Sequence, residues 1–310
     1  MELTLDIASL NNKFGIGALL SFTQLLSGTK LIAIDTPLAA ATISLEGGQV
    51  VAWHPKSQSE PVLWVSKLAQ FAPGKAIRAG VPICWPWFGA HPKSSQLPGH
   101  GFARVVPWSV ESTRVDAEGV IDVKLKLADA EVPEKLRPAG WPQSVSLAAR
   151  YRIGETLEVS LSTENNSEHE IRFTEGLHTY FQVGDAESVQ VLGLDKCEFV
   201  DLLDGNQRRQ QKGPITFEGE VGKIFVSCDK ATIIEDRKLG RNIHVVGAGS
   251  TSIAVWNPGL TTASKMPDLG SEGWKTMVCV ETANALENSI QLHPGCSHTT
   301  TAVYSVVALT

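Results

Sequence analysis

The sequence predicts an all-β protein made of antiparallel strands in a sandwich or barrel. Apolar and charged residues alternate strictly over residues 121–127, and the same period of two recurs over 157–162. Helical periodicity is nearly absent, and glycine, proline and asparagine separate the candidate strands. Of all residues, 43% are hydrophobic and only 19% are charged, which excludes intrinsic disorder and indicates a large buried core.

Candidate strands follow one another along most of the chain. Residues 148–153 and 157–162 are separated by Gly154, which is a turn signal. The best helical candidate, 132–137, contains Pro133 and is followed by Pro138, so it cannot exceed about two turns. Further strands are expected at residues 31–35, 41–45, 49–53, 62–65, 232–235, 242–246, 252–256, 276–281 and 299–307.

Composition bounds the organisation and the partners of the chain. We find no fixed-length repeat and no linker, so we expect residues 1–310 to form a single domain with 1–30 as a peripheral segment. Lys and Arg number 27 against 33 Asp and Glu, and a net charge of −6 argues against a nucleic-acid partner. The five cysteines are scattered without a Cys-x-x-Cys pair, which is typical of a reducing compartment. Neither a signal peptide nor an apolar run of ~20 residues is found, so we expect a cytoplasmic protein without a membrane partner.

Residues 76–89 break the strand pattern. They contain two prolines, two glycines and three aromatic side chains, which a regular central strand does not tolerate. So rigid a loop can wall a binding site and stack on a sugar ring, or it can plug one end of a barrel with tryptophans.

A second irregular segment, 97–104, places His100 and Arg104 on either side of a turn of small residues, where both could face one ligand. A guanidinium suits a phosphate because it donates two parallel hydrogen bonds. A lone arginine is also common as a surface ion-pair partner, so the spacing alone leaves both possibilities open.

His178 and Glu281 are candidates for acid–base chemistry. Glu281 ends an apolar run in which a carboxylate is costly unless it is paired or used, and strand alternation places Cys279 on the same face. An imidazole and a carboxyl facing one cavity could exchange protons near neutral pH. The alternative is a hydrogen-bonded core histidine and a charge at a strand end, which is the commoner arrangement for single residues of these types.

Other catalytic patterns are missing from the sequence. His293, Cys296 and His298 lie close together, but no second cluster accompanies them, so we predict no metal site. The chain has no Gly-x-Ser-x-Gly elbow and no glycine-rich phosphate loop. We therefore expect no metal and no cofactor.

Five motifs occur in the order and spacing of one family. They are IRAGVPICWPWFG (77–89), HGFAR (100–104), LHTYF (177–181), WNPG (256–259) and VCVE (278–281). Through them the chain resembles the D-hexose-6-phosphate mutarotases, or glucose-6-phosphate 1-epimerases, of the aldose 1-epimerase superfamily. The likeness covers about residues 30–305. It implies a large antiparallel β-supersandwich of the galactose mutarotase type.

The resemblance also implies an activity. His178 would protonate the ring oxygen of a hexose 6-phosphate, and Glu281 would take the proton of the anomeric hydroxyl, so that the α and β anomers interconvert. This isomerase reaction needs no cofactor, and its partner is a small-molecule sugar phosphate.

The remaining site residues are assigned by the resemblance to substrate binding. Arg78 and Arg104 would hold the 6-phosphate with His100 beside them, and Trp256 and Asn257 would also contact the substrate.

Two positions depart from the family pattern. Ala79 replaces a glycine beside a phosphate ligand. Gly222 stands where family members often carry an aspartate that contacts the sugar, and Glu220 is a candidate to replace it.

Two other functions compete with this one. A mutarotase for unphosphorylated aldoses would have no use for Arg78 and Arg104 together. A non-catalytic carbohydrate-binding protein would have no use for a matched acid and base at His178 and Glu281.

Overall fold

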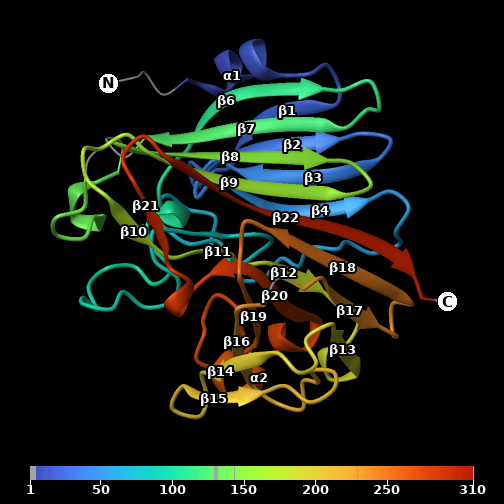
Figure 1. The fold of residues 1–310 in the computed structure, drawn as a ribbon. Coiled ribbons are helices and arrows are strands. Elements are labelled where there is room, and N and C mark those ends of the chain that lie inside the picture. The colour runs from blue at the N-terminus through green and yellow to red at the C-terminus, as the bar shows by residue number, and fades with distance from the viewer. Residues whose placement is uncertain (1–4, 129–131, 143, 229, 310) are drawn as a thin grey trace.

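The computed structural model describes residues 5–128, 132–142, 144–228 and 230–309. Figure 1 shows a molecule built mainly of strands. The helices and 3₁₀ turns are α1 (Ile7–Phe14), η1 (Ala103–Val105), η3 (Glu134–Leu136), η4 (Ala186–Ser188), α2 (Gly259–Ala263), η5 (Gly273–Thr276) and η6 (Leu286–Asn288). No helix in these ranges is long and apolar enough to cross a membrane.

The strands are β1 (Leu20–Gln24), β2 (Lys30–Asp35), β3 (Ala39–Ser44), β4 (Gln49–Pro55), β5 (Ile83–Cys84), β6 (Ser109–Val115), β7 (Ile121–Ala128), β8 (Val145–Ile153), β9 (Leu157–Asn165), β10 (Ile171–Phe173), β11 (Glu175–Leu177), β12 (Tyr180–Gln182), β13 (Val189–Leu192), β14 (Glu198–Asp201), β15 (Gln207–Gln210), β16 (Val221–Val226), β17 (Thr232–Asp236), β18 (Arg241–Ala248), β19 (Ser252–Asn257), β20 (Met277–Asn284), β21 (Ile290–Leu292) and β22 (Ser297–Ala308).

These strands form two large antiparallel sheets and two smaller ones. One eight-stranded sheet has the order β13-β17-β18-β22-β9-β8-β7-β6. The other runs β15-β14-β16-β19-β20-β11-β5, with β12 also paired to β20. The first four strands form a sheet in sequence order, and β10 pairs with β21. The predicted all-β antiparallel sandwich is confirmed.

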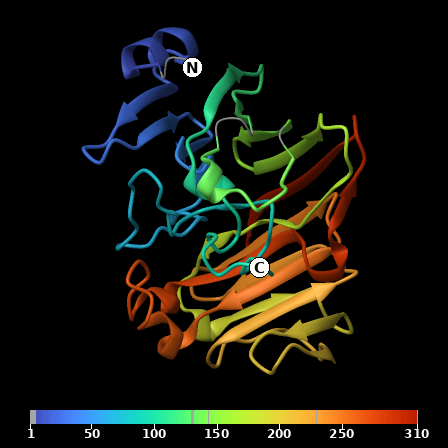
Figure 2. The same cartoon turned by 90° about the vertical axis from the view of Figure 1, so that its left-hand side faces the viewer.

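The layers are held by the apolar faces that the sequence pattern predicts. In β7 every second residue, from Ile121 to Leu127, is buried, and the charged residues between them are less so. β20 packs against β18 and β22, so the two large sheets share an interior. Most of the buried apolar side chains of these sheets and of β1–β4 form one continuous cluster. In Figures 1 and 2, α1 and the β14–β15 hairpin lie at opposite ends of the molecule.

The N-terminal segment adds an edge strand. β1 pairs only with β2, at the rim of the four-stranded sheet. Asp6 caps α1 by accepting a hydrogen bond from the Ser9 backbone N–H at 2.8 Å. Because Phe14 and Phe22 are buried, this segment also contributes to the core, which the sequence pattern did not indicate.

Two predicted elements are wrong. Residues 62–65 do not form a strand but make two isolated bridges, Leu63 with Phe181 and Val65 with Ala79. The backbone of this segment turns from one partner to another, so no continuous ladder can form. The expected helix at 132–137 is a single 3₁₀ turn, η3, because the prolines at its two ends prevent extension.

A buried polar network joins the two large sheets near β11. Glu175 is fully buried, and its Oε1 accepts hydrogen bonds from Asn284 Nδ2 and from the Thr300 hydroxyl. His298 Nε2 lies 3.1 Å from the same oxygen. The hydrogen bond and the charge of Glu175 raise the pKa of His298, so the imidazolium form is favoured in the folded protein.

This network should make the stability of the fold depend on pH. A raised pKa of His298 gives stability that is present below about pH 6.5 and is lost as the pH rises through the folded-state value. Glu175→Gln removes the charge that His298 pairs with. We expect this variant to be less stable than wild type by about 1–3 kcal/mol at pH 6, and the difference to shrink or reverse at pH 9. Urea unfolding at the two pH values measures it; an unchanged difference would contradict the assignment.

Candidate active site

The register of β20 places His178 opposite Glu281. β20 pairs with β11 at Thr282 and Leu177, and with β12 at Cys279 and Tyr180, in one continuous register. Between these pairs the β20 ladder is interrupted, because the Thr179 backbone N–H donates to the carbonyl of Leu177 at 2.9 Å, while the His178 N–H points to the other side of the strand and donates to the carbonyl of Pro82 at 3.0 Å. The register on either side of the interruption places His178 opposite Glu281.

The two side chains are close, buried and unpaired. His178 Nδ1 lies 3.5 Å from Glu281 Oε2, and the side chains are 7% and 2% exposed. Neither of these two atoms has a hydrogen-bond partner among the described residues. Buried polar atoms are normally satisfied, so this pair is available for a ligand.

Burial disfavours the charged forms of both His178 and Glu281. It lowers the pKa of His178 well below its ordinary value, and the positive charges around the imidazole act in the same direction. Burial raises the pKa of Glu281 well above its ordinary value, opposed by the positive charge of Arg104. In the free protein we therefore expect one proton on the pair, held by the carboxyl beside a neutral imidazole.

Aromatic rings fix the position of His178. Tyr180 stacks on it in parallel, with centroids 4.8 Å apart and an interplanar angle of 6°. Trp256 meets its edge at 5.9 Å and 83°. The predicted residue Trp256 is therefore at the site, and Tyr180 was missed as a site residue although it lies within the LHTYF motif.

Arg78 contacts Tyr180 at the site, and its guanidinium forms an ion pair with Asp268. Its Nη1 donates to the Tyr180 hydroxyl at 2.7 Å. Its Nε donates to Asp268 at 3.1 Å, and its Nη2 lies 3.0 Å from the same carboxylate. No pattern in the sequence marks Asp268, because it lies in a connecting loop far from Arg78 along the chain.

Arg104 differs from Arg78 in having no carboxylate salt bridge among the described residues. Its Nη2 donates to the carbonyl of Gly99 at 2.7 Å, and its Nε has no partner in the part of the chain that the structure describes. It is nonetheless close enough for its charge to act on both His178 and Glu281. Arg104 is thus the more available of the two cations for an anionic ligand.

His100 sits beside the pair in a constrained loop. Its ring centroid lies 5.2 Å from that of His178, and its Nδ1 accepts a hydrogen bond from the Gly89 N–H at 3.3 Å. Burial lowers the pKa of His100 to about 3, so its imidazole is neutral. The next residue must be glycine, because a Cβ on Gly101 (φ +77°) would lie 1.9 Å from the Trp85 carbonyl oxygen.

Asn257 is held by hydrogen bonds within the protein. It is completely buried, and its Nδ2 donates to the carbonyls of Trp274 and Met277 at 2.9 and 2.7 Å. Its Oδ1 accepts from the Gly259 N–H at 2.8 Å. The side chain thus holds the connection between β19 and β20, and the contact with substrate that the resemblance implies for it stays a prediction.

Gly222 lies in β16. It lies directly opposite Trp256 in the β16–β19 ladder, and a Cβ there would make only ordinary contacts, with Leu202 and Leu203. Glu220 accepts a hydrogen bond from the Thr262 hydroxyl at 2.6 Å, so it has a partner of its own.

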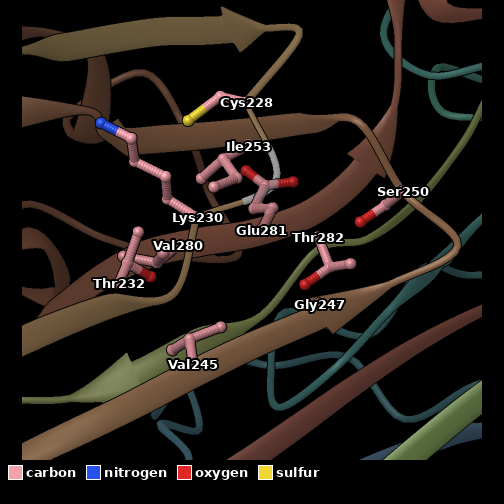
Figure 3. A pocket seen from close by; sticks show the side chains of 10 residues that line it. All are labelled: Cys228, Lys230, Thr232, Val245, Gly247, Ser250, Ile253, Val280, Glu281 and Thr282. Carbon is pink, nitrogen blue, oxygen red and sulfur yellow. The ribbon is translucent and has the colours of Figure 1, made fainter. Parts of the chain in front are cut away.

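A small pocket borders the opposite face of β20. Figure 3 shows Val280 and Thr282 projecting toward Val245 and Gly247 of β18, between the two large sheets. Glu281 also borders it, but strand alternation gives Cys279 and Glu281 the other face. The pocket has room for about one water molecule, so it cannot hold a sugar.

Cys279 lies beside the His178–Glu281 pair. It lies two residues before Glu281, and the ligating atoms of Cys279, His178 and Glu281 are all within 4.8 Å of one another. These three donor types together are able to hold a metal ion, although the sequence predicted no metal site.

Comparison with known proteins identifies relatives over most of the chain. Residues 30–305 match the family model described as Aldose 1-epimerase. A protein of Escherichia coli (strain K12), provisionally named glucose-6-phosphate 1-epimerase, is 38% identical over 259 residues, covering 83% of this chain and 84% of its own. A protein of Salmonella typhimurium (strain LT2) with the same name is 35% identical over 283 residues, or 89% of this chain and 92% of its own. The crystal structure of a provisionally assigned mutarotase from Salmonella typhimurium has a TM-score of 0.87 and 32% identity, covering 95% of this chain and 96% of that one.

The unpaired carboxyl should lower the stability of the fold. Because burial raises the folded-state pKa of Glu281, stability falls as the pH rises from about 4.5 through that value. Glu281→Gln removes the ionisation, and we expect the variant to be more stable than wild type by about 1–3 kcal/mol at pH 8 but not at pH 4.5. Chemical unfolding at both pH values measures this. Glu175→Gln is the matched control, because that carboxylate has partners and its loss should destabilise the protein near neutral pH.

Proposed function

Because the chain belongs to the aldose 1-epimerase family, we propose that it interconverts the α and β anomers of a hexose 6-phosphate, with glucose 6-phosphate as the expected substrate. The observation that carries this proposal is the buried His178–Glu281 pair, whose facing atoms are 3.5 Å apart and otherwise unpaired. A reaction that moves one proton off a substrate and another onto it needs two such groups at one carbon.

The proton count of the pair fits the reaction. In the active form Glu281 is ionised and His178 is protonated, which needs the same single proton as the neutral pair. Glu281 removes the proton of the C1 hydroxyl while His178 protonates the ring oxygen, so the C1–O5 bond breaks and an aldehyde forms. Rotation about C1–C2 presents the other face of the carbonyl. The two groups then return their protons in reversed roles, and the ring closes as the other anomer.

Two aromatic side chains fix the orientation of the proposed acid, His178. Tyr180 and Trp256 hold His178 from its face and its edge, so the imidazole cannot rotate freely away from Glu281. Fixed geometry of this kind can contribute a large part of a rate acceleration, since the reacting groups need not be collected from solution.

Arg104 and Arg78 support a phosphorylated substrate. Arg104 has no carboxylate partner among the described residues and keeps free donors for an anion. A phosphate there would also offset the positive charge that disfavours protonated His178. The names of the curated relatives point to the same substrate class.

One observation favours an unphosphorylated aldose instead. Asp268 already neutralises Arg78, so only one of the two predicted phosphate ligands has its charge free. A mutarotase that acts on free sugars remains the alternative, and substrate selectivity separates the two functions.

The chemical assignment is tested by Glu281→Gln and His178→Asn. Each change removes one proton-transfer group, so we expect the enzymatic rate with glucose 6-phosphate to fall by about 10²–10⁴. Exchange NMR of the anomeric protons measures the rate against the spontaneous reaction. A variant that equilibrates the anomers as fast as wild type would refute the role of that residue.

Substrate selectivity is tested at Arg104 and Asp268. Arg104→Ala should raise KM for glucose 6-phosphate about 10- to 100-fold, as expected for the loss of a charged hydrogen bond, and leave KM for glucose unchanged. Asp268→Asn frees Arg78 and should lower KM for the phosphate ester. Arg150→Ala, which removes an ion pair with Asp122 between β7 and β8, is the control for loss of charge alone. Equal effects of Arg104→Ala on both sugars would favour the free aldose.

A further inference from the structure

We propose that Cys279, His178 and Glu281 form an inhibitory binding site for a thiophilic divalent cation such as Zn²⁺. Cys279 and Glu281 project from the same face of β20, and His178 lies opposite Glu281 in the neighbouring segment. Their ligating atoms are all within 4.8 Å of one another. The three residues thus come from two adjacent, hydrogen-bonded parts of one sheet, which holds their backbones in place.

The distances are near those that zinc requires. With bonds of about 2.0–2.3 Å, the ligand atoms of a tetrahedral site lie about 3.3–3.6 Å apart. The separation of His178 Nδ1 and Glu281 Oε2, 3.5 Å, already falls in this range. The Cys279 sulfur lies within 4.8 Å of the other ligand atoms, so a shift on the order of 1 Å brings it into this range.

A second observation points to a ligand at this place. His178 Nδ1 and Glu281 Oε2 are buried and have no hydrogen-bond partner among the described residues, although both face the same point. Leaving such groups unpaired is costly, and a cation between them would satisfy both. Bound as thiolate and carboxylate, Cys279 and Glu281 would also balance the two charges of the ion, with the thiol proton released to solvent.

The donor set selects the kind of cation. One sulfur, one nitrogen and one oxygen suit Zn²⁺ or Co²⁺, whereas Mg²⁺ and Ca²⁺ prefer sites made only of oxygen. Three protein ligands leave a fourth position for water. Since the ion would occupy the acid and the base of the proposed reaction, the expected effect is competitive inhibition, and this part rests on the proposed function.

The binding is tested first without reference to activity. The protein is titrated with Co²⁺ alone, and we expect a sulfur-to-cobalt charge-transfer band that saturates at one equivalent. Cys279→Ser should abolish the band. The matched control is Cys228→Ser, which removes one thiol of the separate Cys228–Cys197 pair, whose sulfur atoms lie 3.0 Å apart; there the band should persist. A band that survives in Cys279→Ser, or that is lost in Cys228→Ser, would overturn the proposal.

Inhibition is tested second, in zinc-buffered solution. Zn²⁺ should abolish mutarotase activity in wild type and in Cys228→Ser, a chelator should restore it, and Mg²⁺ should have no effect. Measured against its own rate without zinc, Cys279→Ser should need at least about tenfold more Zn²⁺ for half-inhibition, since even outer-shell partners are worth 10- to 100-fold in metal affinity. Equal inhibition of Cys279→Ser would refute the site. If wild type shows no mutarotase activity, the proposed function fails while the cobalt titration still decides the metal site.

Discussion

The proposed chemistry depends on two groups, His178 and Glu281, that share a site out of water. His178 and Glu281 face each other out of water, and burial disfavours the charged form of each. A pair with one proton has two forms, a neutral one and an ion pair, and passing between them needs no proton from solvent. The nearby charge of Arg104 favours ionised Glu281, whereas the same charge disfavours protonated His178. The balance is therefore set by charges outside the pair.

In the proposed reaction, the phosphate of the substrate would act on His178 as well as orient the sugar. A phosphate bound at Arg104 brings negative charge into a site where positive charge holds His178 neutral. It would orient the sugar and, by the same contact, favour the imidazolium that the ring-opening step needs. Asp268 neutralises Arg78, so the effect of a bound phosphate on the charge near His178 would act through Arg104. Arg78 contacts His178 indirectly, because it donates to the Tyr180 hydroxyl and the Tyr180 ring stacks on His178. Under the proposed function, substrate binding and the protonation of His178 would be coupled through this short chain of contacts.

Local patterns predicted much of the fold, and motif order predicted the two central residues. The alternation in 121–127 is enough to define β7, because each strand residue faces either core or solvent. The facing of His178 and Glu281 could not be predicted in this way, since it depends on the register in which β20 pairs with β11 and β12, and a local period does not fix that register between distant segments. Asp268 and the structural role of Asn257 were missed for a similar reason. Their contacts join segments far apart in sequence and leave no local period.

Two buried glutamates, Glu175 and Glu281, differ in whether the protein provides partners for their charge. Glu175 and Glu281 lie on neighbouring strands of one sheet and are equally inaccessible to water. Asn284, Thr300 and His298 surround one oxygen of Glu175 and make its charge tolerable. The facing oxygen of Glu281 has no such partners among the described residues, so its ionisation opposes folding. Stability alone does not account for a buried carboxyl left unpaired beside an equally unpaired imidazole, whereas the proposed reaction uses both groups.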